Sequence, residues 1–378
     1  MAHQRCVPGF DERATMRDAE QEAGDATPFA ALGPDAVLDA VESTGRLCDA
    51  RMLALNSYEN RVWQVGIEDA EPVIAKFYRP GRWSDEQILE EHAFTAELAA
   101  LEIPAVPPLA DEDGVTLHRH GGLRFALYPR RGGRAPDPGD PEALEMLGRY
   151  LGRIHAVGAT RAFEHRPRFS VTEYGHDCRA FLLGSDLLDV SVRSTYESVT
   201  AQLLTAIERD YPPLEDFRAL RLHGDCHLGN VLWRDDTPHF VDFDDARTGP
   251  AIQDLWMMLS GERHERVVQC LDLLEGYEEF MDFDARELVL IEPLRTLRIL
   301  HHAAWIGRRW SDPAFPLAFP DFATPRFWAD HVTALREQQR PCRKRRSPCR
   351  STEGGPVGPA PRRQSRRVRA MCEAAEKR

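Results

Sequence analysis

The chain has 378 residues, of which 42% are hydrophobic, enough for two domains and a sizeable core. No run of eighteen apolar residues occurs, so we expect no transmembrane helix and no membrane partner. The first residues lack the apolar core of a signal peptide, which predicts a cytoplasmic location. The eight cysteines form no CxxC pair, which favours unconnected, reduced thiols over a disulfide framework.

The formal net charge of −13 conceals an asymmetry along the chain. Residues from Arg340 onward include thirteen Lys/Arg and three Asp/Glu, a net charge of +10, which leaves −23 for residues 1–339. An acidic body makes nucleic acid an unlikely main partner and suits a cationic or basic substrate. Solubility alone explains the acidity equally well.

The amino-terminal third alternates between short helices and strands. Residues 1–27 are polar with little to bury, and we expect a disordered extension there. The pattern then predicts a short helix over Ala36–Ser43 and a longer one from Ser84 or Asp85 to about Leu101. Four β-rich segments predict strands: Val62–Ile67, Pro72–Tyr78, Val115–His118 and Leu123–Tyr128. These elements make a small strand-rich lobe over residues 28–128.

A Pro-, Gly- and Arg-rich segment, Pro129–Asp140, is a plausible boundary between two lobes. The rest, over residues 129–339, is mainly helical with one hairpin. Predicted helices are Pro141–His155, Val192–Tyr211, Ile252–Ser260, Val267–Phe280 and Arg286–Arg309. Residues 340–378 lack apolar periodicity, and we expect a disordered basic tail outside the functional domain.

The stretch Arg221–Asp245 carries the chemistry. Asp225 and Asn230 are five residues apart, and Asp242 follows twelve residues later, each at the end of a short apolar segment. A turn at Asp235–Pro238 predicts a β-hairpin that brings these three polar groups to one end. A carboxylate that receives or orients an acceptor hydroxyl, beside an Asn–Asp pair that binds Mg²⁺, is what phosphoryl transfer needs. A lone Asp in a turn more often caps backbone N–H groups, but this spacing favours catalysis.

Neighbouring residues leave alternatives open. His223 and His227 are a conceivable zinc pair but have no third ligand at a suitable spacing, so structural hydrogen bonds are favoured. Cys226 has no clear activating neighbour, and Asp244 is a weaker candidate metal ligand. Asp254, which opens a helix, is expected to brace the Asp225 loop or to act as an ordinary N-cap.

In the small lobe, Lys76 ends a β-rich run, and a lysine leaving a buried strand needs anionic partners. Triphosphate oxygens and a helix carboxylate, Glu91 or its neighbour Glu90, are the expected partners. Ser57 lies where a phosphate-covering turn is expected, between Leu55 and Arg61, although this turn has no glycine.

Several of these strings together resemble known proteins. H-G-D-C-H-L-G-N (His223–Asn230) is similar to the catalytic loop of protein kinases, and Asp242-Phe243-Asp244 stands where they have DFG. Over Phe29–Glu337 the chain resembles the stress response kinase A family, in the aminoglycoside phosphotransferase branch of the protein-kinase-like fold. The strings that carry this resemblance are Leu55–Gln64, Lys76–His92, Arg221–Asp235, Asp244–Trp256 and Arg308–Pro316.

The resemblance implies a bilobal α+β protein-kinase-like fold and an ATP- and Mg²⁺-dependent, monomeric, cytoplasmic serine/threonine protein kinase of the stress response. Asp225 would be the proton acceptor and Asn230 and Asp242 the magnesium ligands, with Asp242 also in the catalytic set. Ser57 would contact ATP and Lys76 would pair with its phosphates. Fold analogy does not fix the acceptor, so a small-molecule kinase of the aminoglycoside, choline or homoserine type is the alternative.

Overall fold

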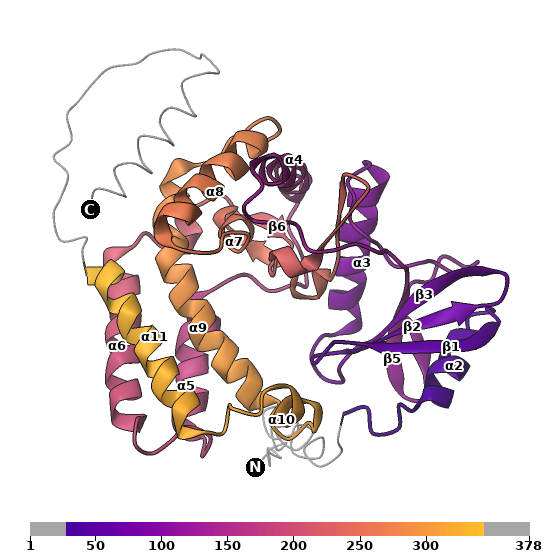
Figure 1. The fold of residues 1–378 in the computed structure, drawn as a ribbon, viewed down its shortest axis with the longest axis horizontal. Coiled ribbons are helices and arrows are strands. Elements are labelled where there is room, and N and C mark those ends of the chain that lie inside the picture. Colours follow the sequence, from indigo (N-terminus) through magenta and orange to yellow (C-terminus); the bar gives the residue numbers. More distant parts are fainter. Residues whose placement is uncertain (1–27, 344–378) are drawn as a thin grey trace, which may run out of the picture.

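The computed structural model describes residues 28–343, and these form a small β-rich lobe and a larger, mainly helical lobe (Figure 1). The predicted bilobal α+β architecture is therefore confirmed. The predicted extension, residues 1–27, lies outside the described residues, as do residues 344–378 of the predicted tail. Helix α11 (Pro325–Arg343) continues into the first four residues of that predicted tail. Among the described helices, none is long and apolar enough to span a membrane.

The small lobe is built on one antiparallel sheet with the strand order β1-β2-β3-β5-β4. Its strands are β1 (Cys48–Leu55), β2 (Arg61–Ile67), β3 (Ala70–Phe77), β4 (His118–His120) and β5 (Leu123–Pro129). One face of the sheet packs on helix α2 (Pro34–Glu42) through a buried apolar cluster that includes Val41, Val65 and Phe125. The strand predicted at Val115–His118 begins three residues later than expected, and β1 was not predicted as a separate strand.

Helix α3 (Asp85–Ala100) lies between the sheet and the helical lobe (Figure 1). Ser84 is its N-cap and forms a capping box with Gln87, which fixes the helix start where the sequence predicted it. Phe94 and Leu98 on α3 are fully buried within the core of the large lobe. The helix therefore carries its charged residues at a fixed position between the lobes.

Two segments outside the large lobe's helices bind to one hairpin. The hairpin consists of β7 (Val231–Arg234) and β8 (Thr237–Phe240). Arg134 exchanges two backbone hydrogen bonds with Trp233, at 3.1 and 2.8 Å. The segment after α3 does the same with Phe240, through Pro104 and Val106 at 2.8 and 3.0 Å. The hairpin is thus held both by the segment that links the lobes and by a segment of the small lobe.

The large lobe contains the predicted helices with shifted ends: α4 (Pro141–Gly158), α6 (Arg193–Asp210), α7 (Ile252–Trp256), α8 (Arg263–Tyr277) and α9 (Ile291–Arg308). Helix α7 is shorter than predicted, and residues Ala285–Leu290 before α9 form a 3₁₀ segment. Helices α4 and α8 pack closely because a glycine on each helix faces the backbone of the other helix. A Cβ at Gly148 would stand 1.9 Å from the Leu273 carbonyl oxygen, and one at Gly276 would stand 1.9 Å from that of Glu145.

Several short elements and one long helix, α11, were not predicted. They are β6 (Leu220–Leu222), β9 (Arg247–Gly249), a π-helix (Thr172–His176), α5 (Asp177–Gly184), α10 (Ala314–Ala318) and α11. The two strands pair with each other over three residues each, and Thr248 of β9 also bridges Arg168. Strands this short carry no alternation that could be read locally. Helix α11 packs on α6 and α9.

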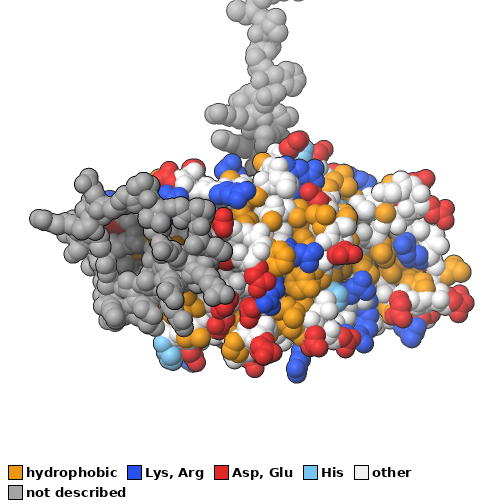
Figure 2. Space-filling model, turned by 90° about the horizontal axis from the view of Figure 1, so that it is seen from above, with side chains coloured by type: hydrophobic (Ala, Val, Ile, Leu, Met, Phe, Trp, Pro, Cys, Tyr) orange, Lys and Arg blue, Asp and Glu red, His pale blue; other side chains and the backbone are white. Residues whose placement is uncertain are grey.

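Among the described residues, neither basic nor acidic side chains form a single-sign patch on the face shown in Figure 2. Lys/Arg and Asp/Glu side chains are interspersed there among apolar ones. The acidity of the body therefore does not by itself identify a substrate surface, and local pairing of charges decides what a site binds.

One buried carboxyl makes stability depend on pH. Glu287, 2% exposed, accepts a hydrogen bond from the Ile252 N–H at 2.8 Å, and burial raises its pKa from 4.5 to about 7. The folded state thus binds this proton more tightly than the unfolded state. Its contribution to stability is complete below pH 4.5 and is lost as pH rises through 7.

We expect Glu287→Gln to remove this dependence. Between pH 4.5 and 7.5 the free energy of unfolding of the variant, relative to the wild type, should rise by about 1–3 kcal/mol. Urea unfolding across this range measures the difference. The exposed Glu275→Gln is the matched control and should give a constant difference; the same constancy for Glu287→Gln would refute the prediction.

Candidate active site

The hairpin turn is tighter than the sequence suggested. Asp235 and Asp236 alone connect the strands, with φ of 50° and 56°, while Thr237 and Pro238 belong to β8. At the opposite end of the hairpin, the Val241 N–H donates to the Asn230 carbonyl at 3.0 Å. The Asn230 side chain donates through Nδ2 to the Asp225 carbonyl at 3.0 Å.

The structure therefore brings the Asp225 loop, Asn230 and the segment that ends in Asp242 together at one end of the hairpin.

Asp254 on α7 braces the loop that carries Asp225. Its carboxylate is fully buried and accepts hydrogen bonds from the backbone N–H groups of His223 and Gly224, both at 2.9 Å. His155 Nε2 lies 3.1 Å from the same carboxylate. Burial opposes ionisation, but the hydrogen bonds from His155 and Gly224 lower the pKa of Asp254 below its usual value. The bracing interpretation is confirmed, and the N-cap alternative is wrong because α7 has no side-chain cap.

The two carboxylate oxygens of Asp225 have different surroundings. Oδ1 accepts from Arg298 Nη1 at 2.7 Å, and Oδ2 lies 3.6 Å from His227 Nε2. The Asp225 side chain is 27% exposed. One oxygen is thus held by a cation on α9, while the other is open to a hydroxyl group.

Asn230 and Asp242 fit a magnesium ion by their chemistry. Asn230 donates through its amide nitrogen, which leaves its Oδ1 free to bind a cation. Asp242 has a left-handed backbone, φ 61° and ψ 61°, and its side chain is 56% exposed. Hard oxygen donors from only two residues suit Mg²⁺, which keeps water and phosphate oxygens as its other ligands. Among residues 28–343, no group of three or more His, Cys, Asp or Glu side chains is placed to hold a metal.

Lys76 is buried and surrounded by carboxylates. Its Nζ lies 3.0 Å from Asp242 Oδ1, 3.2 Å from Asp244 Oδ1 and 4.0 Å from Glu91 Oε1. Burial alone would lower its pKa, but these three carboxylates raise the pKa of Lys76 well above its usual value. The structure places Glu91 beside Lys76, whereas Glu90 accepts backbone hydrogen bonds from residues 164–166.

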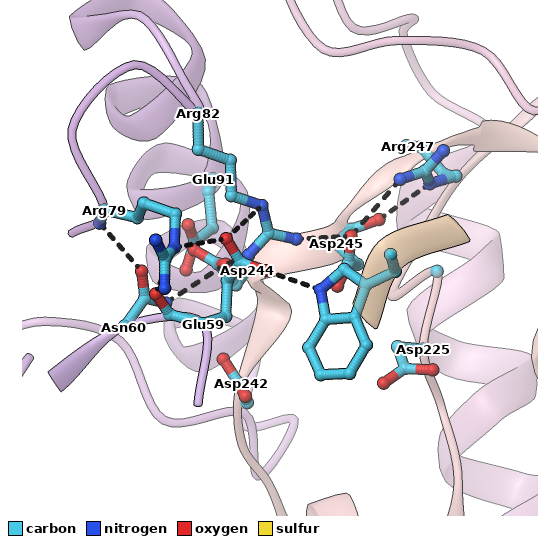
Figure 3. Close-up of polar contacts among 12 residues, drawn as sticks. Glu59, Asn60, Arg79, Arg82, Glu91, Asp225, Asp242, Asp244, Asp245 and Arg247 are labelled. Atoms are coloured by element: carbon cyan, nitrogen blue, oxygen red, sulfur yellow. Dashed lines mark hydrogen bonds and ion pairs between the residues drawn. The ribbon is translucent and has the colours of Figure 1, made fainter. Parts of the chain in front are cut away.

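Asp244 is engaged in a buried ion network rather than open to a metal. Its Oδ2 accepts from Arg82 and, at 3.1 Å, from Asn60 Nδ2. Figure 3 shows Asp244 among these contacts, with Asp242 and Asp225 lying outside them. Despite burial, Arg82 and Lys76 hold the pKa of Asp244 at about 2. The geometry makes Asp244 a partner of cationic side chains within the protein. From the sequence, Asp244 is only a weaker candidate metal ligand than Asp242.

The turn between β1 and β2 is shaped by side chains instead of glycines. Ser57 Oγ donates to the Asn60 carbonyl at 3.2 Å, and Asn60 Oδ1 accepts from the Arg79 N–H at 3.1 Å. Arg61 and Arg79 both bind the buried Asp312 of the large lobe, at 2.9 and 2.6 Å. Ser57 thus lies on a turn that is tied to both lobes.

Sequence reasoning missed three arginines of the site. Arg166 binds Glu91 at 2.8 Å and the Asp244 carbonyl at 2.7 Å, Arg82 binds Asp244 and Asp245, and Arg298 binds Asp225. Arg82 lies in Lys76–His92, one of the strings that carry the resemblance. The resemblance identified this segment but did not show which residues Arg82 contacts. For Arg166 and Arg298 no local signal existed, because their partners are 73 to 78 residues distant in sequence.

The two alternatives at the loop are not supported. His223 is fully buried and its Nε2 lies 2.9 Å from the Val241 carbonyl, as a structural histidine would. Cys226 is also fully buried, and burial raises the pKa of its thiol well above the usual value. A buried neutral thiol is a poor nucleophile.

Comparison with known proteins agrees with this geometry. Residues 52–289 match the model of the phosphotransferase enzyme family. The chain is 44% identical over 310 residues, 82% of this chain and 93% of the relative, to stress response kinase A of Escherichia coli (strain K12). It has the same identity and coverage to serine/threonine protein kinase RdoA of Salmonella typhimurium.

Among solved structures, amicoumacin kinase hAmiN in complex with AMP-PNP, Ca²⁺ and Ami shares the fold. The TM-score is 0.63 at 17% identity, over 87% of this chain and 94% of that one. The family model and the 44% identical relatives agree on a phosphotransferase with kinase activity. The chain belongs to the phosphotransferase enzyme family and, within it, to the stress response kinase A family.

Proposed function

We propose that this chain is a Mg²⁺-dependent serine/threonine protein kinase that transfers the γ-phosphate of ATP to protein hydroxyls. The observation that carries the proposal is the Asp225 carboxylate, fixed by Arg298 on one oxygen and open on the other, beside Asn230 and Asp242. The name of one 44% identical relative supports a protein acceptor, and the name of another supports a part in the stress response. We also propose a cytoplasmic location and a monomer.

In this proposal Asp225 holds the acceptor hydroxyl and takes its proton on Oδ2. The hydroxyl oxygen then forms a bond to the γ-phosphorus as the bond from that phosphorus to the bridging oxygen of ADP breaks. The proton leaves Asp225 to solvent after product release. The brace from Asp254 keeps the loop still during transfer, so little reorganisation is needed.

Asn230 and Asp242 would hold the metal, and Lys76, positioned by Glu91, would pair with phosphate oxygens. When bound, Mg²⁺ supplies positive charge that neutralises the phosphates. Lys76 now lies 3.0 Å from Asp242, so phosphate binding would replace that carboxylate as its partner. Ser57 and its neighbouring N–H groups would cover the phosphates from the β1–β2 turn.

A small-molecule kinase is the second candidate. It is favoured by a cavity of about 710 Å³ next to Arg298, which has the size of a site for a drug-sized ligand. The cavity would then enclose the whole acceptor rather than one segment of a protein.

Labelled ATP separates the two functions. Purified protein is incubated with labelled ATP and Mg²⁺, with a generic protein substrate on one side and a panel of amino alcohols and aminoglycosides on the other. We expect label in protein, and none when EDTA removes the metal. Label confined to small molecules would overturn the protein acceptor, and label that persists in EDTA would overturn the metal requirement.

A further inference from the structure

A cavity opens beside Asp225 between α9 and α11. It is lined from α9 by Arg295, Arg298, Ile299 and His302, and across from it by Trp256, Asp321, Arg326, Phe327, Asp330, His331 and Ala334. Arg298 belongs both to this wall and to the Asp225 pair at 2.7 Å. Asp225 itself does not line the cavity, and Arg298 joins the two. An acceptor that extends from the cavity to Asp225 would have its adjoining groups against α9.

The wall nearest Asp225 carries two arginines, each with one carboxylate partner. Arg295 and Arg298 are three residues apart on α9 and so lie on one face of the helix. Arg295 forms a 3.8 Å pair with Glu292 and lies over the Trp256 ring, at 5.9 Å. Within the described residues, the one carboxylate that Arg298 binds is that of Asp225.

The other ionisable groups of the cavity lining oppose the charge of these two arginines only in part. Arg326 and Asp330 form their own pair at 3.8 Å, and both are more than three-quarters exposed. Burial and Arg298 lower the pKa of His302, and burial lowers the pKa of His331 to about 4, so both are neutral at pH 7. Asp321 is the one remaining acid of the lining. Two arginines thus dominate the end of the cavity at which transfer takes place.

We propose that the cavity selects acceptors with a carboxylate or phosphate next to the reacting hydroxyl, and that its occupant is a Ser/Thr of an acidic protein segment. The inference rests on the proposed function. A guanidinium has five N–H donors, and Asp225 uses one of those of Arg298. A carboxylate on a neighbouring acidic side chain can accept hydrogen bonds from the remaining N–H donors in a bidentate pair.

The charge also changes during the reaction in a way that favours such an acceptor. When Asp225 receives the hydroxyl proton it becomes neutral, and Arg298 loses its counter-charge. An anionic group on the acceptor restores that charge balance. A basic residue beside the hydroxyl would instead face two arginines, and repulsion would exclude it. The overall acidity of the chain pointed to a basic substrate, but the residues at the site reverse that expectation.

Three peptides that differ only in the residues flanking one serine, Glu, Ala or Lys, test the inference with the full chain, Mg²⁺ and labelled ATP. We expect kcat/KM for the Glu peptide to exceed that for the Lys peptide by roughly 10- to 100-fold. Arg295→Gln should reduce this ratio by about tenfold, and Arg298→Gln should reduce both the ratio and the rate. Arg308→Gln is the matched control on α9, because Arg308 packs on Phe181 outside the cavity.

The outcomes separate the inference from the function on which it rests. A Glu preference that falls in Arg295→Gln but not in Arg308→Gln supports the anion site. Peptides that are phosphorylated equally, or best with Lys, overturn the inference and leave the protein kinase assignment intact. If no peptide is labelled while a small alcohol is, the protein acceptor itself is wrong, and the acidic segment is overturned with it.

Discussion

Asp225→Asn should lower the rate of phosphate transfer by roughly 10²- to 10⁴-fold, the usual contribution of a general base. The amide cannot take the hydroxyl proton, and it also loses the charge that holds Arg298 at 2.7 Å. ATP binding should persist, because the residues proposed to hold the nucleotide, Lys76, Asn230 and Asp242, are unchanged. Turnover with labelled ATP and titration with a fluorescent ATP analogue measure the two effects separately.

Asp235→Asn is the matched control for this variant. It makes the same chemical change at the far end of the same hairpin, where the side chain is 87% exposed and the left-handed backbone, φ 50°, tolerates asparagine. Wild-type turnover is expected. Undiminished turnover in Asp225→Asn would contradict the role of the loop carboxylate, and loss of ATP binding would show a defect that is not confined to proton transfer.

The fold could be predicted from the sequence wherever local pattern decides it. Ser84 with Gln87 marks the start of α3, and alternating apolar residues mark β2 and β3, because capping and side-chain period depend on near neighbours. Helix α11 lies at the end of the described chain and was missed, although it packs on α6 and α9. The three-residue strands β6 and β9 were missed because pairing between distant segments alone defines them.

In the candidate site, too, local sequence predicted some features, and contacts between distant segments determine the others. Spacing and turn chemistry brought Asp225, Asn230 and Asp242 to one end of the hairpin, and the hydrogen bonds at that end are in place. Their roles stay predictions, as do those of Ser57, Lys76 and Glu91 and the boundaries of the lobes. What sequence could not supply was the pairing of charges between distant segments, such as Arg298 with Asp225. Such pairs leave no local pattern, since each member resembles an ordinary surface charge.

Asp254→Ala should lower the free energy of unfolding by about 3–5 kcal/mol, because it leaves buried donors without a partner. The backbone N–H groups of His223 and Gly224 lose their acceptor, and His155, also fully buried, loses its carboxylate. The two N–H groups lie directly before Asp225, so the loop should also move and the rate of transfer should fall. Urea unfolding and turnover of the same sample measure both effects.

Two further variants distinguish bracing from general damage. The exposed Asp186→Ala should unfold within about 0.5 kcal/mol of the wild type, as surface substitutions do. Asp254→Asn keeps one carbonyl oxygen and should restore part of the stability and part of the rate together, since one acceptor remains for the loop. An Asp254→Ala protein within 1 kcal/mol of the wild type would show that the loop is held by other contacts. Loss of activity at unchanged stability would instead mean that Asp254 acts on the chemistry without stabilising the fold.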